Sequence, residues 1–289
     1  MPNRRELGYV SAGSTSTVLV STGNYGRATG GIGSPTAVTI NSVNYEYLTF
    51  NATGTLTVTT AGFFDYLAVG GGTGNQNESG YPGGAGGSGA VVIGTIYLSA
   101  DATVTIGAGS ATAANITTQR TAGDTTINAP SPFAVVAVGS QSVGAGDGNI
   151  TGFVAGGSGH AAGGTTQKGL NNIAAGYRGG KTDGVNAAGG GGGFSAVGGN
   201  GVSNTGGDGG AGFDVSVFIG GSSLFKASGA GGGGATTGGV GGSSLGNNGT
   251  ATTTPVSGGA NTGCGGGGGK GVTTTGAGGS GICYIRYKV

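Results

Sequence analysis

The sequence predicts an all-β protein, a small β-sandwich of the jelly-roll type whose short strands are joined by long glycine-rich excursions. The first observation behind this prediction is glycine, which accounts for 77 of 289 residues, about 27% against a usual share of about 7%. The second is a series of β-branched and aromatic runs that interrupt the glycine clusters, as at 66–69, 90–93 and 282–285. Third, no stretch of a dozen residues carries a helical period free of glycine, so we expect essentially no helix.

The strand signals sharpen from Tyr45 onward. Residues 45–50 and 55–60 alternate in polarity, and the short turn 51–54 joins them as a hairpin. Residues 63–69 are a third expected strand, which runs directly into three glycines. The remaining expected strands, several of them weaker, are 90–98, 103–106, 125–127, 133–138, 153–155, 215–219, 224–227 and 282–287.

The glycine clusters need a physical account, because glycine loses more conformational freedom on folding than any other residue. Most chains this rich in glycine are disordered linkers, but a linker would not need the strand-like runs. Segments without Cβ atoms can lie side by side as extended helices with three residues per turn, hydrogen-bonded between neighbouring backbones. Collagen is excluded, because no stretch keeps glycine at every third position and the chain has only six prolines. We therefore expect the excursions to pack as polyglycine II helices braced by the strands.

Residues 1–45 differ from the rest and are predicted to form an N-terminal attachment segment, with 46–289 as the glycine-rich β and polyglycine domain. Two short strands are expected at 7–10 and 17–20, followed by a turn-rich break at 30–35. The segment is too short to hold a large core and could gain order on a partner. An ordinary first hairpin of a single domain is the alternative for this segment.

Composition excludes several classes of protein. With 11 basic and 10 acidic residues and a formal net charge of +1, the chain lacks the basic footprint of a nucleic-acid-binding protein. No stretch approaches the ~20 apolar residues of a transmembrane helix, and the first residues lack the apolar region of a secretion signal. We therefore expect neither membrane insertion nor classical export. Cys264 and Cys283 do not make a disulfide framework, and we expect free thiols rather than a single bridge.

The sequence shows no constellation of catalytic residues. Residues 175–182 fit a relaxed Walker pattern, but glycines follow where phosphate binding requires a helix. His160 has no cysteine or acidic residue near it in sequence, so neither a zinc site nor a catalytic triad is indicated. The aspartates stand mostly beside turns, and nothing positively supports the paired carboxylates of a glycosidase. We predict no enzyme, no catalytic residue, no metal and no cofactor.

Four segments carry a resemblance to a known family: residues 48–58, 64–72, 87–92 and the closing run 276–287. They are similar to the opening and the closing strand of the glycine-rich domain found in many phage tail-fibre and receptor-binding proteins. The resemblance implies a virion adhesin, located at the tail or another external surface of the particle, that binds a host surface molecule. It also implies stacked polyglycine II helices whose connecting loops set the host range.

Residues with large or charged side chains in or beside the excursions are the candidates for receptor contact, because an aromatic ring at a loop tip offers broad contact area at a low entropic cost. The receptor-binding candidates are Tyr81, His160, Tyr177 and Arg178. The alternative is that such rings plug the edges of the glycine lattice, and this is the expectation for Phe153 and Phe194.

The favoured function is that of a phage tail fibre or spike adhesin that binds a bacterial surface polysaccharide or outer-membrane protein. Its N-terminal segment would dock on other virion proteins. The alternative is a capsid fibre or head decoration protein without dedicated receptor binding, and a non-viral ice-binding or cell-wall protein is a third class. We expect a homotrimer joined through the N-terminal part, because virion symmetry favours closed cyclic assemblies.

Overall fold

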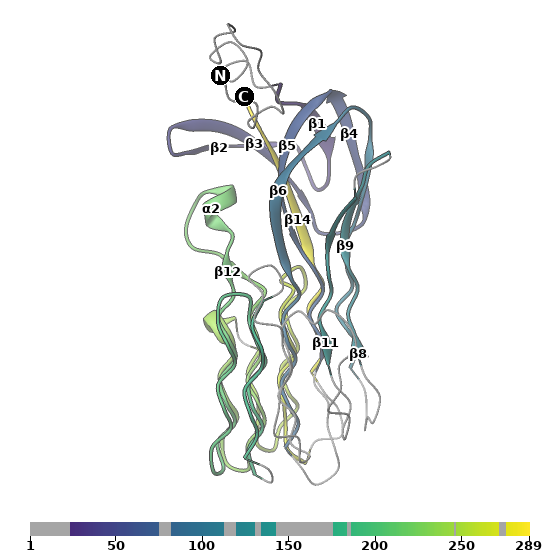
Figure 1. The fold of residues 1–289 in the computed structure, drawn as a ribbon. Helices are drawn as coiled ribbons and strands as arrows, with labels where there is room; N and C mark the ends of the chain where they lie inside the picture. The colour runs from purple at the N-terminus through teal and green to yellow at the C-terminus, as the bar shows by residue number, and fades with distance from the viewer. Residues whose placement is uncertain are drawn as a thin grey trace, which may run out of the picture.

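The computed structural model describes residues 24–74, 82–112, 120–130, 134–142, 176–183, 186–245, 247–271 and 276–289. In this part of the chain nearly all regular structure is β, in several antiparallel sheets, which confirms the all-β, sandwich-like fold predicted from the sequence. A sandwich of strands lies at one end of the molecule, and glycine-rich segments continue from the strand ends toward the other (Figure 1). No helix among the described residues is long and apolar enough to cross a membrane.

Sheet A has five antiparallel strands. In spatial order they are β2 (Thr36–Ile40), β3 (Val43–Phe50), β14 (Ile282–Lys288), β5 (Gly62–Val69) and β6 (Val91–Leu98). The last strand in sequence lies at the centre, where Cys283 on β14 is paired with Phe50 on one side and Ala68 on the other. The sheet is therefore complete only when the two distant ends of the described chain have met.

Sheet B also has five antiparallel strands. In spatial order they are β1 (Arg27–Gly30), β4 (Gly54–Thr60), β7 (Ala102–Thr105), β9 (Thr125–Asn128) and β10 (Ala134–Ala137). A small sheet of β8 (Arg120–Thr121) and β11 (Gln141–Ser142) lies farther along the same segments. Residues 27–40, from the segment expected to serve for attachment, supply β1 and β2 to the two sheets. The strands expected at 7–10, 17–20 and 153–155 lie outside the described residues.

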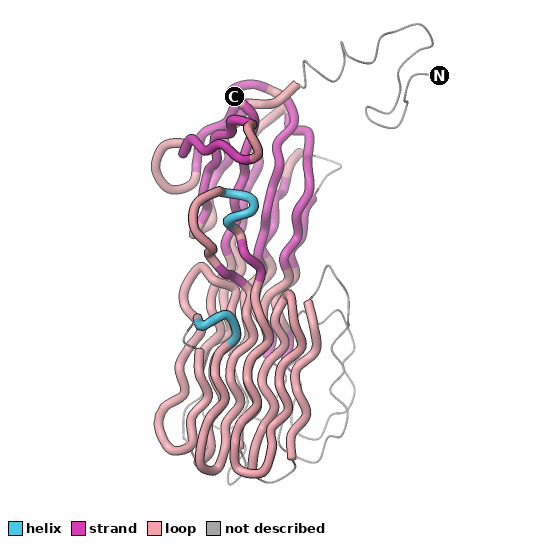
Figure 2. Tube along the Cα trace, turned by 90° about the vertical axis from the view of Figure 1, so that its left-hand side faces the viewer, coloured by secondary structure: helices cyan, strands magenta, loops and turns pink. Residues whose placement is uncertain are grey.

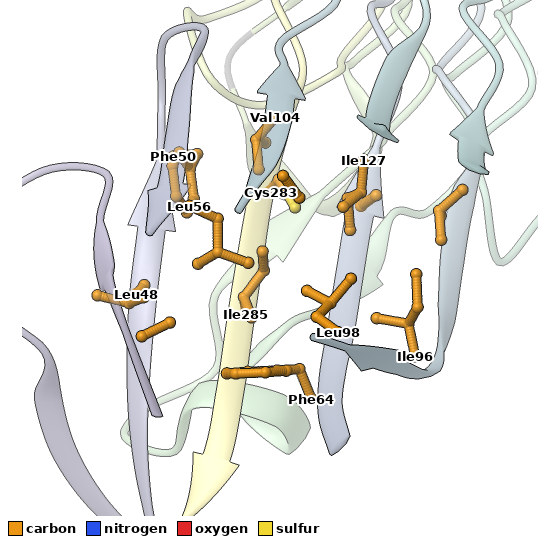
Figure 3. Packing of buried hydrophobic residues seen from close by; sticks show 14 of the residues in the cluster. Leu48, Phe50, Leu56, Phe64, Ile96, Leu98, Val104, Ile127, Cys283 and Ile285 are labelled. Atoms are coloured by element: carbon orange, nitrogen blue, oxygen red, sulfur yellow. The ribbon is translucent and has the colours of Figure 1, made fainter. Parts of the chain in front are cut away.

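The main core fills the space between the two sheets (Figure 3). Alternation along β14 directs Cys283, Ile285 and Tyr287 into this core. The Tyr287 hydroxyl is 3.1 Å from the carbonyl oxygen of Ala28 and 2.9 Å from a carboxylate oxygen of Glu46. Burial, together with the Glu46 carboxylate, raises the pKa of Tyr287 to about 12, so the phenol stays protonated as a donor. The other large, fully buried side chains of this core are those of Leu48, Phe50, Leu56, Phe64, Leu98, Val104 and Ile127.

Both cysteines are buried and free, as the sequence predicted. Cys283 lies in the main core, where burial raises the pKa of its thiol. Cys264 lies in the glycine-rich half, where its sulfur accepts a hydrogen bond from the Ser228 hydroxyl at 3.3 Å. Neither thiol is placed to react with solvent.

The glycine excursions lie side by side as extended segments joined by backbone hydrogen bonds, and we call this part the glycine lattice (Figure 2). Partners recur every third residue: the amides of Gly190 and Gly193 donate to segment 196–199, at 2.9 and 3.0 Å. Gly241 has φ −66° and ψ 144°, close to the polyproline II values of about −75° and +145°. The segment containing Gly190 bonds in the same three-residue repeat to 83–88, 177–180, 207–210 and 227–233. This is the packing of polyglycine II helices.

Polar side chains on the outside of the glycine lattice cap amides of neighbouring segments. The Asp208 carboxylate accepts a hydrogen bond from the amide of Val240 at 2.7 Å. The side-chain oxygen of Asn200 accepts one from the amide of Lys181 at 2.8 Å. These side chains thus bind backbone amides of neighbouring segments and serve the lattice itself.

One excursion leaves the glycine lattice and lies against sheet A, and we call residues 212–227 the arm. It contains β12 (Phe213–Asp214), the one-turn helix α2 (Ser216–Ile219) and β13 (Phe225–Lys226); a second short helix, η1 (Gly242–Ser244), lies elsewhere in the lattice. The strand predicted at 215–219 is therefore wrong. The Asp214 carboxylate accepts hydrogen bonds from the amides of Ser216 and Leu224, at 3.0 and 2.9 Å, and so folds this stretch into a turn.

The arm is attached to sheet A through a second apolar cluster and one arginine. Phe218 and Val215 pack with Leu67 and Tyr284 on the face of sheet A that points away from sheet B. The guanidinium carbon of Arg286, on β14, lies 4.2 Å from the ring centroid of Phe218. The arm thus links the glycine lattice to the central strand of the sandwich.

We expect a pH titration centred on Asp214. Burial alone would raise the pKa of this carboxyl, but the hydrogen bonds from Leu224 and Ser216 outweigh it and lower the pKa to about 2. The folded-state pKa is below the unfolded value of about 3.9, so the carboxylate stabilises the arm above pH ~4 and loses this effect as the pH falls toward 2. The Leu224 amide resonance should titrate with a midpoint near 2 in NMR spectra, and Asp214→Asn should abolish the change. A midpoint near 4 would contradict this geometry.

Candidate functional site

The candidate site is the end of the glycine lattice farthest from the sheets, where the chain reverses between lattice segments (Figures 1 and 2). We call it the distal end. Glycine forms the straight segments, whereas asparagine, serine and threonine are common in the turns, where their side chains bond to local backbone. The described residues of the distal end are 181–183, 186–187, 201–205, 234–237, 250–253 and 270–271.

The turn at 202–205 is held rigidly. Val202 and Thr205 exchange two backbone hydrogen bonds, of 3.0 and 2.9 Å. Ser203 has φ +56°, a left-handed conformation that is uncommon for residues other than glycine. The carbonyl of Asn204 accepts a hydrogen bond from the amide of Thr236 at 3.0 Å, so the turn is fixed to its neighbour.

A second set of contacts ties three distant segments together. Asp183 accepts hydrogen bonds on its carboxylate from the amides of Asn186 and Ala187, at 3.0 and 2.7 Å. The carbonyl of Asn186 accepts from the amide of Ala235 at 2.8 Å. Its side-chain oxygen accepts from the Lys270 ammonium at 3.2 Å. The distal end is therefore a connected surface and not a set of independent loop tips.

The exposed groups of the distal end suit recognition of a polar surface. Val202 is 63% exposed, the most exposed of the large apolar residues in the described part of the chain. Around it Lys181, Ser203, Asn204 and Thr236 are exposed, which together offer ammonium, hydroxyl and amide groups. Hydrogen-bonding groups beside an apolar contact are what a saccharide or a polar protein loop requires.

Within the described ranges no group of three or more His, Cys, Asp or Glu is placed to hold a metal.

Two of the four receptor-binding candidates from the sequence can be placed. Tyr81 and His160 lie outside the described residues. Tyr177 and Arg178 are half-buried at the start of a lattice segment. The same segment reaches the distal end only at Lys181.

Tyr177 lies at the end of the glycine lattice next to the sandwich. Its amide donates to the carbonyl of Gly193 at 2.9 Å. Phe194, which follows Gly193 in the sequence, packs edge-on against Phe213 of the arm, with ring centroids 5.4 Å apart. Phe194 thus fills the edge of the lattice, as the packing alternative expected. The structure does not bring Tyr177 and Arg178 to the distal turns.

The residues that build the distal end are not among the candidates predicted from the sequence. A signal for them exists in the short interruptions of the glycine runs, such as the four residues Val202 to Thr205 between Gly201 and Gly206. A tetrapeptide of this kind between two glycine segments indicates a reversal of direction. Lys270 could not be found this way, because it meets Asn186 only through the fold.

The comparisons with known proteins agree with the architecture. No curated protein matches the chain. The family model described as "Glycine-rich domain" matches residues 48–288, which covers both sheets from within β3 onward and the whole glycine lattice. Since this match spans well over half of the sequence, the chain belongs to the glycine-rich domain family.

Proposed function

We propose that the chain is a virion structural protein, a phage tail-fibre or spike adhesin whose distal end binds a receptor on the host cell surface. The observation that carries the proposal is that the two ends of the molecule differ: the sandwich lies at one end and the turns of the glycine lattice lie at the other. The C-terminal end of β14 lies at the end of the sandwich away from the glycine lattice (Figure 1). There the nitrogen of Lys288 lies 4.8 Å from the ring centroid of Tyr25. A protein held at that end presents its distal turns outward, and loops on a rigid scaffold are the usual place for binding residues.

The proposed receptor is a bacterial surface polysaccharide or an outer-membrane protein. The hydroxyl and amide groups at 203–205 and 236 match the hydroxyls of a sugar, and the Lys181 ammonium matches an acidic sugar. Val202 adds an apolar contact at the same place. The rigid turns reduce the entropy lost on binding.

We also propose that residues 1–45 dock on other virion proteins. The chain would then be held on the outside of the particle. The homotrimer expected from the sequence stays a prediction.

Competition for adsorption tests the proposal directly. Purified chain in excess should block adsorption of the parent phage to its host, and fluorescently labelled chain should stain host cells. A folded chain that neither stains cells nor competes would contradict the adhesin and favour the alternative, a capsid fibre or head decoration protein.

Val202→Glu is expected to weaken binding to host cells at least tenfold, because a carboxylate replaces the apolar contact at the distal end. Val217→Glu is a matched control, since Val217 is 61% exposed on α2, away from the distal end. Flow cytometry with labelled protein measures binding, and thermal melts followed by circular dichroism check that both variants fold. Equal binding by the two variants would contradict this location of the site.

The candidates from the sequence can be separated from the distal end in the same assay. If receptor contact lay beside the sandwich, Tyr177→Ala and Arg178→Ala would lose binding while Val202→Glu kept it. If the distal end binds the receptor, Val202→Glu loses binding while Tyr177→Ala and Arg178→Ala keep it.

A further inference from the structure

Strand β6 forms one edge of sheet A, at the far side of the sheet from the other edge strand, β2. It is eight residues long, whereas the outer strands β1, β2 and β10 have four or five. It pairs with β5, and among the residues that the structure describes no backbone hydrogen bond reaches its other side. Val91–Leu98 contains no charged residue and no proline, the two commonest means by which natural edge strands avoid association. An edge of this length and polarity is a template for another strand.

The exposed side chains of β6 are arranged symmetrically. Ile93 and Tyr97 are 49% and 48% exposed, on the face of sheet A that carries the arm. Thr95 lies midway between them on the same face, because successive strand residues alternate. The arm buries Val91 on this face but leaves the other three residues uncovered.

Neighbouring strand β5 holds these side chains in place. The ring of Tyr97 packs edge-on against Phe63, with centroids 5.4 Å apart. The hydroxyl of Thr95 donates to the Asp65 carboxylate at 2.7 Å. The exposed surface of β6 is therefore ordered before any partner binds, which lowers the entropic cost of association.

We propose that β6 pairs with β6 of a second copy of this chain, antiparallel, about a two-fold axis that passes through Thr95. In this register Ile93 of one protomer lies opposite Tyr97 of its partner, and the same pair occurs again on the other side of the axis. Aromatic and β-branched residues directly opposite each other are favourable cross-strand pairs. The two copies of sheet A become one continuous sheet.

A second copy is the occupant that the observations favour over an unrelated strand. The apolar pair stands at equal distances from Thr95, so the surface is complementary to itself, as a two-fold interface requires. The absence of charge on β6 means that two copies meet without repulsion. A slip by one residue would place the apolar side chains on opposite faces and lose both pairs. One strand pair is a small contact, so we expect a dimer that forms in the micromolar range.

Cysteine trapping tests the register in the full-length chain. Thr95→Cys should form a covalent dimer under mild oxidation, because the two thiols face each other across the axis. Ile93→Cys and Tyr97→Cys should cross-link when mixed and much less when oxidised separately. Thr39→Cys, an exposed threonine on the opposite edge strand β2, is the matched control and should stay monomeric. The native thiols are buried and do not interfere.

Sedimentation equilibrium tests the association without added cysteines. The mass of the unmodified chain should rise with concentration from monomer to dimer, in place of the homotrimer expected from the sequence. Ile93→Lys should raise the dissociation constant at least tenfold with an unchanged thermal melt. Cross-linking of Thr95→Cys no faster than that of Thr39→Cys would overturn the proposal. So would a monomer at every concentration, or a trimer that Ile93→Lys leaves intact, which would instead support assembly through the N-terminal part.

Discussion

Gly191→Ala should lower the free energy of unfolding by about 3 kcal/mol or more. Gly191 lies inside the glycine lattice, where its amide donates to the carbonyl of Ala230 at 2.8 Å. A Cβ at this position would overlap the carbonyl oxygen of Gly86 and lie 3.2 Å from the amide nitrogen of Ala230. Both are backbone atoms of neighbouring segments, so no side chain can rotate away to relieve the overlap. Chemical denaturation followed by circular dichroism measures the loss.

Gly54→Ala is the control for this prediction. Gly54 begins β4, and a Cβ there would meet only the Phe50 ring, at an ordinary 3.8 Å. Its effect should stay below about 1 kcal/mol, within the cost of a substitution that creates no overlap. If Gly191→Ala lowered the free energy of unfolding as little as Gly54→Ala, this would contradict the close approach of the lattice segments.

The strands were predictable because their signals are local. The alternation at 55–60 and the apolar run at 63–69 are visible in the sequence, and β4 and β5 lie there. The polyglycine packing was predictable in kind, since only segments without Cβ atoms can approach this closely. Which segments adjoin was not predictable. Segment 188–194 bonds to 83–88 and to 227–233, and glycines carry no side chain that would distinguish one partner from another.

The arm and the distal end could not be predicted, because both form through contacts between residues that are far apart in the sequence. A strand was predicted at 215–219 from its β-branched and aromatic residues, but hydrogen bonds to the Asp214 carboxylate fold the chain into α2 instead. Tyr177 and Arg178 are candidates in the sequence because they are large or charged side chains among glycines. In a lattice that runs the length of half the molecule, a residue's sequence neighbours do not reveal whether it lies near the sandwich or at the distal end. That position is set by where each segment turns.

Arg286→Ala should destabilise the protein by about 3 kcal/mol and release the arm from sheet A. The guanidinium lies between two rings, with Tyr45 and Phe218 centroids at 4.3 and 4.2 Å from its central carbon. It donates to the Phe218 carbonyl at 2.7 Å and is 3.3 Å from an Asp65 carboxylate oxygen. Each cation–π contact contributes about 0.5–2 kcal/mol and a charged hydrogen bond about 1.5–3. The ion pair is partly exposed and adds less, about 0–1 kcal/mol.

Arg286→Lys separates the contribution of the positive charge from that of the planar guanidinium group. Lysine keeps the positive charge near Asp65 but lacks the planar group that stacks between two rings and reaches the Phe218 carbonyl. The lysine variant should therefore lose at least half of the stability that alanine loses. Hydrogen exchange should rise in the arm in both variants, while β7 and β9 in sheet B stay protected. Because Arg286 lies on the central strand and its partners on β3, β5 and the arm, uniform exchange across the molecule would mean that it supports the whole sandwich. Exchange confined to the arm would mean that the arm is a separately opening unit, whose closed position on the apolar cluster of sheet A requires this side chain.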